Sequence, residues 1–323
     1  MSAKPVRVSV VLITYNHERY IAQALESVLS QQTDFGVEIL VTEDCSTDRT
    51  AEIVRALGTR EPERIRLLLS EKNLNSNRVT SRAIDAARGE FIALLDGDDY
   101  WTVPDKLRAQ VAFLDSHADC ALCFHDALVV YEDSDNVPHS FVQSHHRGIS
   151  SLRDILRSNF VPGCSALIRR SALHPLPAWY ENAEYGDWPL YLLAARHGSI
   201  GYVDATMGIY RRHAGGYWSG KSQREQYAGL VSFFNRLEAN FDSRYRTDVR
   251  HARARWHATL AQALADEGDT RRAAGAMLAA LRDDPHPTSS AVRQRLRDFA
   301  RFFGRSLLGP RRAVSPPAGE SPR

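Results

Sequence analysis

The chain has 323 residues, 43% of them hydrophobic, which is enough for one large domain or for one domain with an appendage. Its formal net charge of +2 at pH 7 is too close to neutral to indicate a general nucleic-acid-binding protein. Polar residues 1–7 lack the hydrophobic region of a signal peptide, and no apolar run is long enough to span a bilayer. We therefore expect a cytoplasmic globular protein that binds no nucleic acid.

The N-terminal third of the chain alternates between short apolar runs and segments with apolar residues at helical spacing. The runs Val6–Ile13, Val37–Thr42, Ile65–Leu69 and Phe91–Leu95 predict four strands. The segments between them predict helices, and we expect the third helix to end at a C-terminal cap on Gly89. This alternation indicates βαβ units and an α/β fold with a mostly parallel central sheet flanked by helices.

Polar clusters follow three of these four strands. Thr14–Glu18 follows the first strand, Glu43–Asp48 the second, and Asp96–Asp99 the fourth. Because the carboxyl ends of parallel strands gather at one edge of a sheet, we expect the three clusters to form a binding crevice there.

The densest of these clusters is Asp96-Gly97-Asp98-Asp99. Three carboxylates this close repel one another, and burying them unpaired is costly. Oxygen ligands of this kind favour a hard cation, Mg²⁺ or Mn²⁺. The alternative is a plain acidic turn, because Gly and Asp both favour turns. The local string leaves both interpretations open.

The middle of the chain predicts a second group of strands and helices. Apolar runs and helical spacing predict strands at Cys120–Tyr131, Cys164–Ile168, Ile200–Asp204 and Thr206–Tyr210, and helices at Leu152–Leu156 and from Asp187 onward. The polar segment Glu132–His146 between them is expected to be a mobile loop.

Two cysteines and a histidine, Cys120, Cys123 and His125, have the spacing of half a zinc site. No second Cys/His pair completes a tetrahedral set. We therefore expect these thiols to lie in the core, where free cysteine is commonly found.

The composition changes near Gly220, beyond which the chain is helical and rich in Arg and Ala. We therefore expect a large α/β domain at 1–220, with halves at 1–103 and 104–220, and a helical region at 221–310. The Pro/Ser/Gly-rich tail at 311–323 is expected to be disordered.

Within the helical region, residues from Leu260 to Pro285 fall at the spacing of one tetratricopeptide-like helix hairpin. Such repeats normally stack, and only one copy is visible. We therefore expect an antiparallel helix pair packed on the α/β domain rather than a peptide-binding array.

A further segment, from Val292 to Leu307, interleaves arginines with an apolar stripe. A helix of this composition can lie flat in an anionic membrane interface, which would place the protein at the inner face of a membrane. The alternative is a terminal helix that packs its phenylalanines on the preceding hairpin. Both interpretations stay open.

Three motifs together resemble the family 2 glycosyltransferases of the GT-A fold. They are Val8-Ser-Val-Val-Leu-Ile-Thr-Tyr-Asn16, Glu43-Asp44-x-Ser46-Thr47-Asp48 and Leu95-Asp96-Gly-Asp98-Asp99. Gly186-Asp187-Trp188-Pro-Leu-Tyr191 and Tyr210-Arg-Arg-His213-Ala-Gly-Gly216 resemble the acceptor half of bacterial members that build surface polysaccharides. The resemblance covers roughly the first two thirds of the chain.

The resemblance implies an inverting transfer of a sugar from a nucleotide-diphosphate sugar, a UDP-sugar above all, to a hydroxyl of a glycan or lipid-linked acceptor. Residues 1–103 would bind the donor and 104–220 the acceptor. The chain departs from the family pattern at Glu43, where members often have Asp, and at Asn75, where they often have Gly. The missing glycine leaves open how Arg78 approaches the nucleotide.

The resemblance also implies roles for the donor half. Residues that would contact the nucleotide are Thr14, Tyr15, Asn16, Glu18, Asp44, Arg78 and Asp96. Tyr15 would stack on the base, Asp44 would accept from a pyrimidine N3–H, and Asp96 would bind the ribose hydroxyls. For Tyr15 the alternative is a packing role at the strand end.

The remaining roles concern the metal and the chemistry. Asp98 would hold Mn²⁺ or Mg²⁺ on the diphosphate. Asp99 would either support the metal site without binding the ion directly or cap the next helix. His213 would ligate the metal or contact the diphosphate, unless it is structural. Asp187 would be the general base, with Glu184 as the alternative base and a plain helix cap as the alternative role of Asp187.

Two rival functions remain. A sugar nucleotidyltransferase would need a glycine-rich basic loop after the first strand, and Thr14–Glu18 is not one. A nucleotide-sugar-binding protein without activity would be expected to lack Asp98 or Asp187, and both are present.

Overall fold

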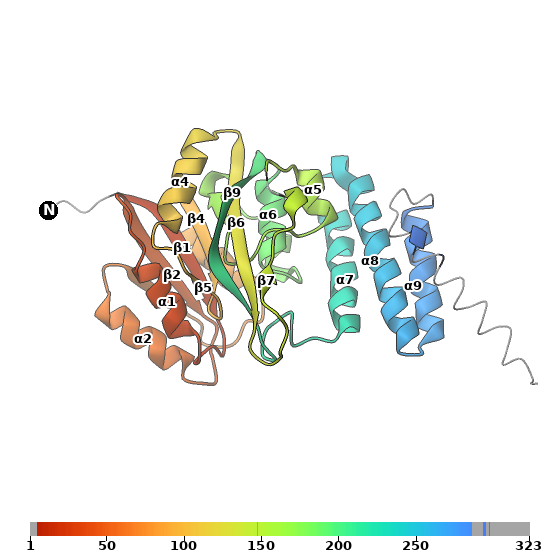
Figure 1. Ribbon diagram of the computed structural model, residues 1–323, viewed down its shortest axis with the longest axis horizontal. Coiled ribbons are helices and arrows are strands. Elements are labelled where there is room, and N and C mark those ends of the chain that lie inside the picture. Colours follow the sequence, from red (N-terminus) through yellow and green to blue (C-terminus); the bar gives the residue numbers. More distant parts are fainter. Residues whose placement is uncertain (1–4, 147, 286–292, 295–296, 298–323) are drawn as a thin grey trace, which may run out of the picture.

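The computed structural model describes residues 5–146, 148–285, 293, 294 and 297. In this part of the chain a nine-stranded mixed sheet is flanked by helices, and three longer helices stand side by side at one end of the molecule (Figure 1). The α/β architecture expected from the sequence is confirmed.

The first half of the sheet is parallel, as predicted. Its strands are β1 (Val6–Thr14), β2 (Gly36–Glu43), β3 (Ile65–Leu69) and β4 (Phe91–Asp96), in the order β3-β2-β1-β4. The helices that connect them are α1 (Ile21–Leu29), α2 (Thr50–Arg60) and α3 (Arg78–Ala86). All three strand ends that carry polar clusters therefore meet at the same edge.

The second half of the sheet is mixed. It adds β5 (Tyr100–Trp101), β6 (Cys120–Tyr131), β7 (His139–Ser140), β8 (Leu167–Arg169) and β9 (Ser199–Arg212). β8 lies antiparallel between β4 and β6, β9 runs parallel to β6, and β5 is antiparallel to β9. Its helices are α4 (Lys106–Ser116), α5 (Leu152–Arg157) and α6 (Asp187–Ala194). The sheet is thus parallel throughout its first half and mixed in its second, where β6 and β9 form a further parallel pair.

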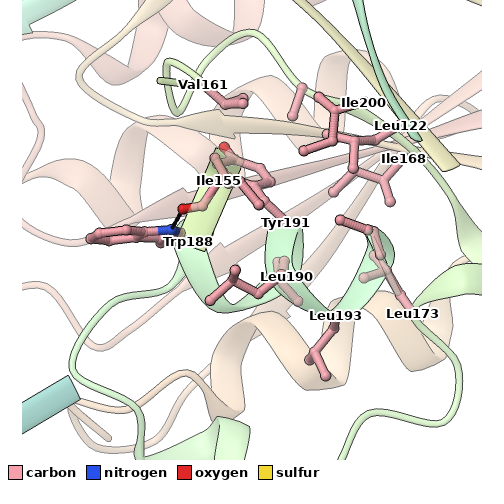
Figure 2. Packing of buried hydrophobic residues seen from close by; sticks show 14 of the residues in the cluster. Leu122, Ile155, Val161, Ile168, Leu173, Trp188, Leu190, Tyr191, Leu193 and Ile200 are labelled. Atoms are coloured by element: carbon pink, nitrogen blue, oxygen red, sulfur yellow. Dashed lines mark hydrogen bonds between the residues drawn. The ribbon is translucent and has the colours of Figure 1, made fainter. Parts of the chain in front are cut away.

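Apolar residues pack on both faces of the sheet. One cluster joins the inner sides of α1, α2 and α4 to the strands, and the other joins those of α3, α5, α6 and the C-terminal α7 (Gln223–Asn240). Figure 2 shows Leu190 and Tyr191 of α6 among the buried residues of the second cluster, and Trp188 Nε1 donates to Ile155 O at 2.9 Å. This hydrogen bond holds the start of α6, where Asp187 is the first residue, against the buried core.

Three segments differ from the prediction. The two strands expected at Ile200–Asp204 and Thr206–Tyr210 are one strand, β9, whose register with β6 is irregular between Val203 and Thr206. The strand expected from Cys164 begins only at Leu167. The segment expected to be a loop, Glu132–His146, contains β7 and a short 3₁₀ helix at Ser144–His146. The cysteines Cys120 and Cys123 are free and buried, as predicted.

Gly89 is not the cap of α3. The helix ends at Ala86, and the cap position, Ala87, has extended backbone. Gly89 instead lies against β1, where its N–H donates to Ser9 Oγ at 2.9 Å. A Cβ atom on Gly89 would lie 2.6 Å from Ser9 N, so this position needs glycine for close approach of two backbones.

We expect Gly89→Ala to destabilise the fold by about 2 kcal/mol, because the methyl group must displace backbone of β1. The free energy of unfolding, measured in urea, tests this. Gly275→Ala is the matched control. A Cβ atom there meets nothing within 4 Å, so the control should be stabilised by about 0.5–1 kcal/mol through helix propensity. An equal effect of the two substitutions would contradict the packing argument.

The C-terminal part consists of α7 (Gln223–Asn240), α8 (Arg246–Asp266) and α9 (Thr270–Asp283). α8 and α9 form the antiparallel hairpin expected from the sequence, with Gly268 at a φ of +84° in the turn. Buried residues of α7, such as Phe233 and Phe234, belong to the same apolar cluster as α6. The domain division at residue 220 stays a prediction, and the core continues across it.

None of the helices in the described residues is long and apolar enough to cross a membrane. The Arg-rich segment from Val292 to Leu307 lies outside the described residues except for 293, 294 and 297. The tail at 311–323 lies wholly outside them.

Candidate active site

The loops after β1 and β2 are joined to each other by hydrogen bonds. Asn16 Oδ1 accepts from Thr47 N at 2.8 Å, and Glu18 Oε2 accepts from Arg49 N at 2.9 Å. In return, Glu18 N donates to Asp48 Oδ2 at 3.0 Å. The side chains of Asn16 and Glu18 therefore hold the loops after β1 and β2 together at this edge of the sheet. Their contact with a nucleotide stays a prediction.

Tyr15 and Thr14 lie beside each other but in different surroundings. The ring of Tyr15 is 39% exposed at the edge, where it is open to stacking. Thr14 is buried, with its hydroxyl 3.3 Å from His17 Nδ1.

Asp44 holds the loop that follows β3. Its carboxylate accepts from the backbone N–H groups of Leu74 at 3.0 Å and of Asn75 at 3.1 Å. Asn75 has a φ of +44°, a left-handed conformation that asparagine tolerates better than most residues. Asn75 thus has a left-handed backbone conformation, which glycine also adopts readily.

The next residues fasten this loop to the second half of the protein. Asn77 Nδ2 lies within 3.1 Å of the carbonyl oxygens of Tyr180, Ala183 and Tyr185, just before α6. This link could not be predicted from the sequence, in which Asn77 is one of several polar loop residues. Arg78 follows at the exposed start of α3.

The acidic turn after β4 meets two histidines. Asp98 Oδ2 lies 3.1 Å from His213 Nε2 and 3.8 Å from His17 Nε2. The hydrogen bond to Asp98 raises the pKa of His213 above its ordinary value. Burial alone would raise the pKa of Asp98, but the bond with His213 and the nearby imidazoles bring it below the ordinary value. The structure brings Asp98 and His213 together, and it adds His17, which the sequence did not single out.

Of the other two carboxylates of the turn, Asp99 is buried and Asp96 is partly buried, and neither has a salt-bridge partner among the described residues. Burial, with the charges of Asp98 and Asp187 nearby, raises the pKa of Asp96 to about 8. Asp99 Oδ1 accepts from Arg211 N at 2.8 Å, while its buried Oδ2 has no hydrogen-bond partner. Asp99 is not the cap of the next helix, because the N-cap position of α4 is Asp105.

Arg211 fixes the turn from β9. Its guanidinium donates to the carbonyl oxygen of Asp98 and to Gln23 Oε1, and pairs with Glu132 Oε1 at 3.1 Å. The pairing of β9 with β5 brings Arg211 next to the acidic turn, so this contact could not be predicted from the sequence.

These residues fit a divalent cation that is shared with a ligand. Among the described residues, no group of three or more His, Cys, Asp or Glu side chains is placed to hold a metal by itself. Asp98 and His213 offer two donors, and the unpartnered Oδ2 of Asp99 marks a local excess of negative charge that a cation offsets. Mg²⁺ and Mn²⁺ commonly complete such a site with phosphate oxygens.

Asp187 is the first residue of α6 and remains partly exposed. Its Oδ1 accepts from Trp188 N at 2.6 Å and its Oδ2 from Asn159 Nδ2 at 3.2 Å. Burial raises its pKa above the ordinary value of an aspartate, although both hydrogen bonds favour the charged form. Asn159 was not identified from the sequence.

Glu184, the alternative base, is engaged elsewhere. Its carboxylate accepts from Ser232 Oγ at 2.6 Å and from the guanidinium of Arg236 at 3.1 and 3.2 Å, both on α7. Burial would raise the pKa of Glu184, but these bonds lower it. This arrangement is that of an ion pair which ties α7 to the segment before α6.

A parallel βαβ half with an acidic turn at its carboxyl edge defines an α/β fold of the nucleotide-binding type. The family model for glycosyl transferase family 2 matches residues 9–176, more than half of the chain. The chain belongs to glycosyl transferase family 2.

Curated relatives agree with this assignment. An uncharacterized protein of Mycobacterium tuberculosis is 38% identical over 211 residues, which are 65% of this chain and 60% of the relative. The putative teichuronic acid biosynthesis glycosyltransferase TuaG of Bacillus subtilis is 34% identical over 130 residues, 40% of this chain and 50% of TuaG. The chain thus spans about three fifths or less of the length of these relatives.

Solved structures show the same fold. Residues 1–349 of Staphylococcus aureus TarS, in complex with UDP-GlcNAc, match with a TM-score of 0.59 at 20% identity, over 94% of this chain and 92% of that one. The mannosyltransferase PcManGT of Pyrobaculum calidifontis, in complex with GDP-Man and Mn²⁺, matches with a TM-score of 0.59 at 19% identity, over 93% and 82%. The predicted GT-A fold is confirmed.

Proposed function

We propose that the chain is an inverting glycosyltransferase that moves a sugar from a UDP-sugar to a hydroxyl of a glycan or lipid-linked acceptor in cell-surface polysaccharide synthesis. The observation that carries this proposal is the meeting of two chemically different centres at one edge of the sheet. Asp98 of the donor half pairs with His213, and Asp187 at the start of α6 lies close enough to Asp96 to raise the pKa of that carboxyl. TuaG and TarS, the latter named as a poly(ribitol-phosphate) β-N-acetylglucosaminyltransferase, support a role in polysaccharide synthesis.

In the donor half, Tyr15 stacks on the base, and Asp44 and Asp96 receive hydrogen bonds from the base and the ribose. Thr14, Asn16 and Glu18 shape the edge on which the nucleoside rests, and Arg78 reaches the diphosphate. The exposed ring of Tyr15 and the exposed position of Arg78 support these roles. The Asp44 carboxylate also binds the backbone of the loop after β3, so one side chain would both position that loop and recognise the base.

Asp98 and His213 would hold the divalent cation, Mn²⁺ or Mg²⁺, whose positive charge would offset the negative charge of the leaving nucleoside diphosphate.

Asp187 accepts the proton of the acceptor hydroxyl as that oxygen attacks the anomeric carbon. The new bond forms on the face opposite the leaving diphosphate, so the configuration at that carbon inverts. The N–H of Trp188 and the amide of Asn159 orient the carboxylate, and each oxygen keeps a lone pair for the proton.

A panel of UDP-, GDP- and dTDP-sugars with Mn²⁺ tests the proposal. A ligand at one hundred times its Kd should raise the stability of the folded protein by about 2.7 kcal/mol, and we expect this from UDP-sugars. UDP should then be released when a glycan acceptor is added. Release of pyrophosphate from UTP and a sugar 1-phosphate, offered in a separate assay, would indicate a nucleotidyltransferase instead, and binding of UDP-sugars without release of UDP would indicate a binding protein.

We also propose a location at the cytoplasmic face of a membrane, through the basic segment from Val292 to Leu307. Truncation after Pro287 should leave the protein folded and abolish its sedimentation with anionic liposomes at low salt. If the truncated protein unfolds, or if the full chain does not sediment with the liposomes, the segment belongs to the core.

A further inference from the structure

The loop at residues 213–221 connects the two centres of the site. It begins at His213, which contacts Asp98, and its Tyr217 hydroxyl donates to Glu184 O at 2.7 Å, three residues before Asp187. One short loop therefore touches the donor carboxylate at one end and the segment of the acceptor base in its middle.

Internal hydrogen bonds give this loop a defined shape. Ser219 Oγ donates to His213 O at 2.7 Å, and Gly220 N donates to Gly216 O at 2.8 Å. Gln226 Nε2 on α7 donates to Trp218 O and to Lys221 O, both at 3.0 Å. The side chains that the loop presents are thus held in place by its backbone.

Two of those side chains form a pair at the surface, in which Tyr217 is exposed and Lys221 is partly exposed. Tyr217 is 61% exposed although its hydroxyl is bonded, and Lys221 Nζ lies 3.3 Å from the centre of its ring. In the described part of the chain no carboxylate lies within ion-pair distance of this ammonium group. Glu184 is taken by Arg236, and Glu225 binds the N–H and hydroxyl of Ser222.

We propose that Tyr217 and Lys221 form an acceptor subsite for a saccharide that carries an anionic group, either a phosphate or a carboxylate. The ammonium binds the anion, and the aromatic ring packs against the adjoining sugar. The inference rests on the proposed function and names the class of acceptor. A cation–π contact at an exposed site contributes only about 0.5–1 kcal/mol, so the ammonium can leave the ring for an anion. A lysine ammonium is a common point-charge ligand of phosphate.

The position of the pair favours the acceptor over the donor. Tyr217 is tied to Glu184, and its ring lies edge-on to Tyr185 at 6.5 Å between centres. Glu184 and Tyr185 lie three and two residues before Asp187. The donor diphosphate is assigned to Asp98 and His213, at the other end of the loop.

Binding of three monosaccharide probes to the protein with Mn²⁺ and UDP tests the proposal by ligand-observed NMR. The probes are methyl β-D-glucoside, which is neutral, methyl β-D-glucuronide, which carries a carboxylate, and glucose 6-phosphate. An exposed ion pair contributes up to about 1 kcal/mol, so we expect a charged probe to bind about five-fold more tightly than the neutral one. Which charged probe gains distinguishes a carboxylate from a phosphate acceptor.

The variants separate the two members of the pair. Lys221→Met should remove the preference for the charged probe, Lys221→Arg should keep it, and Tyr217→Leu should weaken all three probes alike. Arg224→Met is the control, because it removes one positive charge nearby that pairs with Glu267 at 3.5 Å, and it should leave the preference intact.

Equal binding of neutral and charged probes by the unaltered protein would overturn the subsite. A loss of UDP affinity in Lys221→Met, without a change in probe preference, would also overturn it by placing Lys221 at the donor. A Lys221-dependent preference in a protein that transfers no sugar would instead count against the proposed function alone.

Discussion

Asp187→Asn is expected to reduce kcat by about a thousand-fold, the typical contribution of a positioned general base. The substitution keeps the shape of the side chain and its place at the start of α6, but an amide oxygen cannot take the proton of the acceptor. Since the base acts on the acceptor, the affinity for UDP with Mn²⁺ should stay within about two-fold. Steady-state rates and calorimetric UDP binding measure the two quantities.

The pH dependence of kcat gives a second readout of the same residue. Burial raises the pKa of Asp187, and only its charged form is a base. The rate should therefore rise with pH through this raised pKa, and the acid limb should lie above the ordinary range of an aspartate. The limb should be absent from whatever activity Asp187→Asn retains.

Glu184→Gln is the matched control for Asp187→Asn. It should weaken the contact with Arg236 on α7, and so lower stability, while leaving most of the turnover. If Glu184→Gln is inactive and Asp187→Asn is active, the assignment of the base is wrong.

The parallel half of the fold could be predicted because its local signals agree with its tertiary structure. β-branched runs form buried strands, and polar residues at three strand ends lie at one edge by topology. The contact of Asp98 with His213 joins residues far apart in the chain, and only the resemblance to a family indicated it. Spacing alone carries no such information.

The parts that could not be predicted depend on contacts that form after the elements pack. Gly89 follows a helix as a cap would, but the approach of β1 decides its role. Glu184 and Asp187 are both acidic residues near the start of α6. Only the ion pair of Glu184 with Arg236 on α7 shows which of the two is engaged in packing. Two extra residues in β9, beginning at Asp204, interrupt its pairing with β6 without ending the strand.

Asp98→Ala is expected to abolish transfer and to weaken UDP binding in Mn²⁺ by at least ten-fold, because it removes the carboxylate that pairs with His213 and that we propose as a ligand of the cation. UDP affinity should then no longer depend on Mn²⁺, whereas the unaltered protein should lose affinity in EDTA and regain it with added Mn²⁺. The fold should survive, since the substitution also relieves repulsion between Asp98 and Asp96. Calorimetric titration of UDP with and without Mn²⁺ measures the effect apart from turnover.

Asp105→Ala provides the control for the loss of one carboxylate close in sequence. Asp105 lies at the start of α4, half-exposed, and pairs with Arg108 at 2.9 Å rather than with any residue of the site. This variant should retain the Mn²⁺ dependence of UDP binding. Asp98→Ala protein with unaltered activity in EDTA would show that the metal assignment is wrong, and equal Mn²⁺ dependence in both variants would remove Asp98 from the set of ligands.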